Sequence, residues 1–76
     1  MREMEFKMER EGLLSEGDKV TVTEGELPGC CYYTIDPSLA MSANIPFNER
    51  LSVTEGTVLS VIRNSRGFYV TVGFEE

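Results

Sequence analysis

The stretch from Glu55 to Glu76 constrains the fold of this chain most, because it has the pattern of two strands joined by a tight turn. Every second residue from Phe68 to Phe74 is apolar, the period of two that places alternate side chains on opposite faces of a strand. The preceding run, Val58 to Arg63, is apolar on both faces, which predicts that it is the more buried of the two. Between them, residues 64–67 have the length and composition of a hairpin loop built on a type I turn, with Gly67 supplying a positive φ. The stretch therefore predicts a β-hairpin.

Alternation predicts further strands upstream of this hairpin. In residues 3–9 the apolar side chains fall on one face; Glu, Met, Lys and Arg also favour helix, and we favour the strand. β-branched residues alternate from Lys19 to Thr23, and Glu24-Gly25 is expected to end that strand. Short strands are also expected over Cys30 to Ile35 and over Leu51 to Thr54. The chain is thus predicted to consist mainly of strands.

The segment between the last two of these strands lacks a sustained period. Asp36-Pro37 is expected to end the strand before it, and Asp36 is a suitable cap for a single helical turn that begins at Pro37. Residues 38–47 show neither a period of two nor one of 3.6. We predict a long ordered loop here, with at most one short helix, held in place by Ile45 and Phe47.

Length and charge limit the classes of function. With 76 residues the chain is expected to form one domain, residues 1–76, with a small core. Its 13 acidic and 7 basic residues give a formal net charge of −6, which repels phosphate backbones. The N-terminal residues lack the apolar core of a signal peptide, and no run reaches the roughly 20 apolar residues of a membrane span. We therefore expect a cytoplasmic protein that contacts no membrane and for which nucleic acid is a poor candidate as a partner.

Three segments resemble the small SH3-like barrels of translation and transcription proteins, including the KOW group. These are Gly17 to Val22, Gly56 to Val61, and Tyr69 to Val72 after the tight turn. In those barrels a G-D-x-V-x-V strand comes first, a long loop follows, and a G-x-V hairpin completes the sheet. The resemblance covers about half of the chain. It implies an all-β fold, a small, partly open SH3-like antiparallel barrel of five or six strands with one long loop.

The resemblance also raises the question of the ligand. KOW-type domains that contact RNA are usually basic, whereas this chain is acidic; peptide-binding SH3 domains carry a Trp pair, and this chain has no Trp. The nucleic-acid alternative would use Arg63, Arg66 and Tyr69, since a basic hairpin tip beside an aromatic residue can pair phosphates and stack bases. Protection of the strand edge by the two arginines is the simpler interpretation, and we favour it.

The sequence offers little support for an enzyme or for a cofactor. Cys30 and Cys31 cannot complete a four-ligand zinc shell in a chain without His, nor does either have a His to act as its base. We expect one of the two thiols to be buried and the other to face the rim of the barrel. Four glutamates beside predicted turns are interpreted as solvated charges rather than as acid/base groups: Glu24, Glu26, Glu49 and Glu55. No cofactor, metal site or catalytic residue is predicted.

Apolar residues in and before the long loop form the strongest candidate for a functional surface. A barrel of this size cannot enclose them all together with the apolar residues of the strands. They either cover one end of the barrel as a lid or meet a partner, which can be another protein or a second copy of this chain. The candidate residues are Tyr32, Tyr33, Leu39, Met41, Ile45 and Phe47. The expected function is thus that of a non-enzymatic module for protein–protein interaction or assembly.

Overall fold

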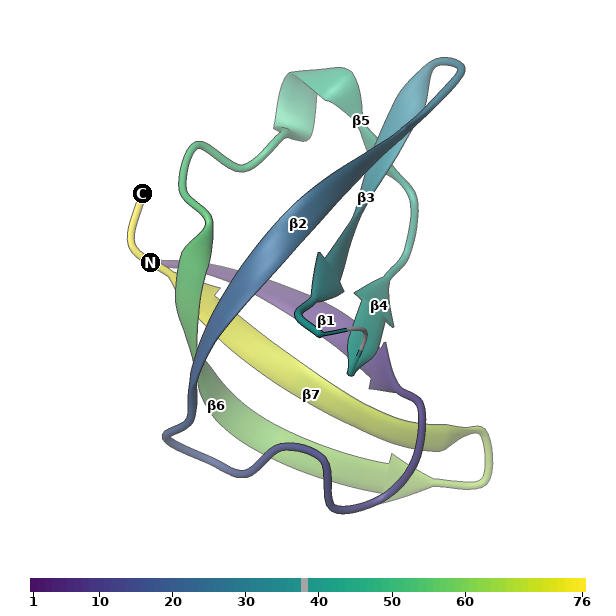
Figure 1. Ribbon diagram of the computed structural model, residues 1–76, viewed down its shortest axis with the longest axis vertical. Helices are drawn as coiled ribbons and strands as arrows, with labels where there is room; N and C mark the ends of the chain where they lie inside the picture. The colour runs from purple at the N-terminus through teal and green to yellow at the C-terminus, as the bar shows by residue number, and fades with distance from the viewer. Residues whose placement is uncertain (38) are drawn as a thin grey trace.

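A computed structural model describes residues 1–37 and 39–76 and shows an antiparallel β-barrel (Figure 1). Its elements in chain order are β1 (Arg2–Met8), β2 (Lys19–Leu27), β3 (Cys30–Ile35), β4 (Ala40–Ser42), β5 (Ile45–Pro46), a 3-10 turn (Phe47–Glu49), β6 (Glu55–Asn64) and β7 (Gly67–Phe74). None of the described residues forms a helix long and apolar enough to cross a membrane. The predicted all-β antiparallel architecture is confirmed.

The barrel closes because β2 changes partners along its length. The strand order is β2-β6-β7-β1-β4-β3-β5, and β2 also pairs with β3. The start of β2, Lys19 to Thr21, pairs with β6, whereas its continuation, Val22 to Leu27, pairs with β3. Six strands therefore form a closed ring, and β5 is an additional strand beside the first residues of β3. Figure 1 shows the β2–β3 ribbon and the β6–β7 hairpin extending from opposite ends of the barrel.

The core is formed by the inner faces of these strands. Phe6 and Met8 of β1 are buried and Met4 packs against them, as their shared face in the predicted strand requires. From the apolar pattern of β2, β6 and β7 we expect seven side chains in the core, and all are buried or, for Phe68, partly buried: Val20, Val22, Val58, Phe68, Val70, Val72 and Phe74. Leu14, from the connector between β1 and β2, is buried with them. The sequence pattern therefore identified the inner face correctly.

The predicted β6–β7 hairpin forms, but its loop is shorter than the four residues expected: Asn64 and Gly67 pair in the ladder, residues 65–66 form the turn, and Gly67 has φ 141°. The prediction that β6 is the more buried strand is wrong. Leu59 is the extra residue of a bulge, and β6 continues beyond the end of its pairing with β2. Val61 and Ile62 are therefore 42% and 47% exposed, although their pattern is that of a strand buried on both faces.

Strand β2 is longer than the sequence indicated, because Glu24-Gly25 does not end it. Gly25 lies opposite Tyr32 in the ladder, and the Tyr32 ring occupies the space that a side chain at position 25 would take. An aromatic ring on the neighbouring strand thus compensates for the missing side chain of the glycine and allows the ladder to continue.

Three predictions for residues 36–54 need correction. The expected loop contains two short strands, β4 and β5, which pair with β1 and β3. The short helix is the 3-10 turn at Phe47–Glu49; Asp36 and Pro37 lie in a turn after β3, and residue 38 of the expected helical turn lies outside the described part. Residues 51–54 do not form the predicted strand. They are held instead by contacts with other elements, which create the site described next.

Candidate binding groove beside strand β1

Residues 47–54 cross one end of the barrel as a strap that is fixed by polar contacts. The Tyr33 hydroxyl accepts a hydrogen bond from the Leu51 N–H (2.8 Å) and donates one to Glu24 Oε1 (2.9 Å). The Arg50 guanidinium donates to both oxygens of Glu24, at 3.1 and 2.8 Å. Arg50 also lies over the Phe47 ring, 5.8 Å from its centroid, a cation–π distance. One buried tyrosine and one ion pair thus hold the strap to β2 and β3.

These contacts change the protonation equilibria of the groups involved. Hydrogen bonds from Arg50 and then Tyr33 lower the pKa of Glu24, because they stabilise its charged form. Burial raises the pKa of Tyr33, and the neighbouring Glu24 carboxylate raises it further. Glu24 is therefore held by specific partners, which corrects the prediction that it is simply a solvated charge. Glu26, Glu49 and Glu55 are exposed, as that prediction requires.

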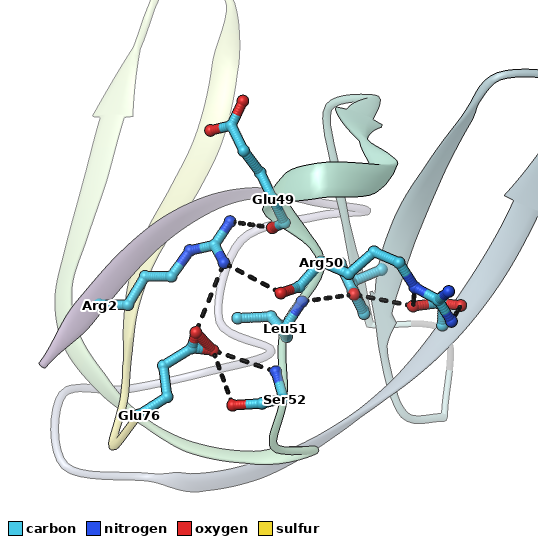
Figure 2. Close-up of polar contacts among 8 residues, drawn as sticks. Arg2, Glu49, Arg50, Leu51, Ser52 and Glu76 are labelled. Carbon is cyan, nitrogen blue, oxygen red and sulfur yellow. Dashed lines mark hydrogen bonds and ion pairs between the residues drawn. The ribbon is translucent and has the colours of Figure 1, made fainter.

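A second set of contacts connects the strap to both ends of the chain (Figure 2). The Arg2 guanidinium donates hydrogen bonds to the backbone carbonyls of Glu49 and Arg50 and forms an ion pair with Glu76 at 3.5 Å. Glu76 Oε1 accepts a hydrogen bond from the Ser52 N–H at 3.1 Å. The Arg2 side chain thereby spans the distance between the start of β1 and the 3-10 turn.

Between β1 and the segment from β4 to the 3-10 turn lies a groove with a volume of about 750 Å³. We call it the β1 groove. One wall is formed by residues of β1 and β7: Arg2, Glu3, Met4, Glu5, Lys7 and Tyr69. The other wall is formed by residues 41–46 and Glu49. Met4 and Ile45 are partly buried against the core, whereas Met41 is 47% exposed, so the groove joins the edge of the core to the surface.

The structure divides the six residues predicted as an interaction surface. Tyr33 is buried and belongs to the network that holds the strap. Leu39 packs against the core, and Tyr32 covers Gly25 on the β2–β3 ribbon. Phe47 is exposed beside Arg50, outside the residues that line the groove. The remaining two, Met41 and Ile45, lie together in the wall of the β1 groove.

Sequence reasoning missed the contribution of β1 to this site. Met4 and Lys7 were interpreted only as parts of the strand predicted over residues 3–9, and Arg2 lay outside that strand, although all three contribute to one wall of the groove. The available signal was the alternation in residues 2–8, which places charged side chains on the outer face of a strand whose inner face is apolar. Nothing in the sequence shows which segment lies beside that strand.

The residues of the nucleic-acid alternative do not share one face. Arg63 pairs in the ladder with Phe68, whereas Tyr69 is the next residue of β7 and points to the opposite face. The Arg63 guanidinium lies 3.2 Å from Glu11 in an exposed ion pair. Arg66 is exposed at the hairpin turn, and Tyr69 lines the β1 groove instead. The charge and the aromatic ring are therefore separated.

The two cysteines are free; Cys31 is buried and Cys30 is partly buried. The Cys31 thiol donates a hydrogen bond to the carbonyl oxygen of Ile45, and the sulfur–oxygen distance is 3.5 Å. Across residues 1–37 and 39–76, no three Cys, Asp or Glu side chains lie close enough together to hold a metal ion. In the comparisons with known proteins, no family model, curated protein or solved structure matches this chain.

Proposed function

We propose that this protein is a non-enzymatic binding module of the SH3-like barrel type that holds a segment of another protein in the β1 groove. The observation that carries the proposal is the groove itself, which has apolar side chains in both walls. Ligand sites in proteins are typically concave, partly apolar and already formed before the ligand arrives. Preorganisation is supported by the pairing of β4 and β5, which holds most of the second wall, and by the Arg2 contacts, which fix Glu49 of that wall.

The barrel type and the cellular location are parts of this proposal. Strand β2, which follows Gly17-Asp18, and the hairpin of β6 and β7 are the parts that resemble SH3-like barrels in sequence, and they lie next to each other in the sheet. Two adjacent free cysteines suit a reducing compartment, which favours the cytoplasm. The nucleic-acid alternative is less favoured, because Arg63 is already paired with Glu11 and Tyr69 lies on the other face.

A selection from a library of random linear peptides tests the proposal. Peptides retained by the immobilised protein are measured again with Met41→Ser, which removes an apolar side chain from the wall of the groove without a change of charge. Leu27→Ser is the matched control, because Leu27 is similarly exposed but lies outside the residues that line the groove. We expect Met41→Ser to weaken binding at least ten-fold and Leu27→Ser to leave it unchanged. Equal binding by both variants would overturn the proposal.

A further inference from the structure

The first half of β1 has an open edge at the groove. Along its whole length, Arg2 to Met8, this strand pairs with β7. On its other side it pairs with β4 only through Phe6, Lys7 and Met8. Residues 2–5 therefore have no neighbouring strand on the groove side within the described part of the chain.

The register shows which main-chain groups face this open edge. The Glu9 N–H donates to the Leu39 carbonyl at 3.1 Å, which continues the pairing of β1 with β4. In an antiparallel ladder every second residue directs its N–H and C=O toward the same neighbour. Lys7, Glu5 and Glu3 therefore face the β4 side, and the peptide groups of Glu3 and Glu5 point into the groove, where no described residue pairs with them through its backbone. An extended segment can bind such groups by strand addition.

The side chains around this edge specify what the added strand should carry. Glu3 and Glu5 are exposed on the outer face and form no ion pair with any described residue. Residues directly opposite them in an added strand would also point outward, where opposite charges are favoured across a ladder. The ligand residue between these two would point inward, toward Met4 and Ile45, which are apolar and partly buried.

We propose that the β1 groove binds an extended basic–apolar–basic segment of a partner protein as an antiparallel strand along Glu3 to Glu5. The proposal rests on the function proposed above and adds the mode of binding and the chemistry of the ligand. Arg2 spans one end of the open edge and the Phe6–Ser42 pairing closes the other. At about 3.3 Å per residue, three ligand residues fit this length. This chain contains no basic–x–basic triplet, so a second copy does not supply the ligand.

The first test uses two synthetic peptides, each acetylated and amidated: Ser-Thr-Lys-Val-Lys-Thr-Ser and its counterpart with both Lys replaced by Glu. Binding is followed by NMR titration of the protein amides and by amide hydrogen exchange. We expect the basic peptide to bind at least ten-fold more tightly. It should slow exchange at Glu3 and Glu5 and leave Met4 and Phe6, which already bond to β7, unchanged. Equal binding of the two peptides would overturn the proposal.

Charge reversal and backbone methylation provide two further tests. Glu3→Lys with Glu5→Lys should reverse the preference toward the acidic peptide, whereas Glu16→Lys with Glu75→Lys changes the net charge equally at exposed positions away from the groove and should not. Methylation of the backbone nitrogen of both Lys residues in the basic peptide should abolish its binding to the unmodified protein. It removes the two N–H groups that would donate to the backbone carbonyls of Glu3 and Glu5. Binding that persists after methylation would overturn strand addition.

The two proposals fail in different ways. If library peptides depend on Met41 but show no basic–apolar–basic pattern, or bind without protecting the Glu3 and Glu5 amides, the groove is a binding site and strand addition is wrong. If no peptide depends on Met41, the proposed function is wrong.

Discussion

At the scale of single residues, Tyr33 connects the core to the strap. Its ring is buried among the core residues, and its hydroxyl joins the Leu51 backbone to Glu24. A buried N–H that loses its acceptor costs about 1–3 kcal/mol of stability. The residue therefore contributes to the shape of the groove through the strap, although it does not touch a ligand there.

Tyr33→Phe should reduce the free energy of unfolding by about 1–2 kcal/mol, because the Leu51 N–H and Glu24 each lose a hydrogen bond. Urea unfolding measures the loss. Tyr32→Phe is the matched control, since the Tyr32 hydroxyl forms no hydrogen bond to another described residue, and its effect should stay below about 0.5 kcal/mol. Similar effects of the two substitutions would contradict the assigned role of Tyr33.

Tyr33 should also limit stability at high pH. Its pKa is raised in the folded state, so the folded protein holds this proton more tightly than the unfolded chain does. The resulting stabilisation is complete below the ordinary tyrosine pKa near 10 and is lost as the pH rises through the higher folded value. Absorbance at 295 nm should show one of the three tyrosines ionising only together with unfolding. In Tyr33→Phe the two remaining tyrosines should ionise without this late step.

Glu24 should affect the stability of the protein at low pH. Its pKa is lowered in the folded state, so its contribution is present above the ordinary value near 4.5 and is lost as the pH falls through the lower folded value. Glu24→Gln should therefore destabilise the protein at neutral pH and weaken the fall in stability on acidification. Glu26→Gln, two residues along the same strand and exposed, should change neither. Thermal unfolding between pH 7 and pH 3 distinguishes the two variants.

At the scale of elements, a strand or turn could be predicted from the sequence where its pattern lies within a few neighbouring residues. β1, β3, β7 and the turn at Gly67 were predicted because alternation and turn chemistry are written within a few residues. β4 and β5 were missed because each is too short to show a period and forms only by pairing with longer strands, β4 with β1 and β3 and β5 with β3. The same limit explains the site. Met41 and Ile45 were among the candidates, but their position beside β1 depends on tertiary pairing.

Substitutions at Leu39 and Met41 distinguish the two interpretations of the predicted surface, namely a lid over the core and an interface for a partner. Leu39 packs against the core, so Leu39→Ser should reduce the free energy of unfolding by about 1–3 kcal/mol through lost burial. Met41 is exposed in the groove wall, and Met41→Ser should change stability by less than about 0.5 kcal/mol. Chemical unfolding of the two single variants tests the assignment. A large loss for Met41→Ser would show that it supports the fold rather than a ligand.

At the scale of the whole molecule, the distribution of charge is the reason that we propose a basic protein partner rather than nucleic acid. The formal net charge is −6, and Arg2, Arg50 and Arg63 each form an ion pair with a glutamate. Phosphate binding requires cations that are free to replace the counterions of the nucleic acid. Three of the seven basic side chains are thus already engaged within the molecule.

Binding to RNA or DNA should therefore remain in the non-specific range, with Kd of roughly 10⁻⁴ M or weaker at physiological salt. A gel shift with single- and double-stranded probes measures it. The informative variant is Glu11→Gln, which frees Arg63 from its ion pair without adding a cation, with Glu16→Gln as the control for the same change in net charge. If Arg63, Arg66 and Tyr69 formed a nucleic-acid site, Glu11→Gln should tighten binding and Arg63→Glu with Arg66→Glu should abolish it. Because Tyr69 lies on the opposite face of β7 from the residue that pairs with Arg63, we expect neither effect. Low-micromolar binding that responds to both changes would instead establish the nucleic-acid function.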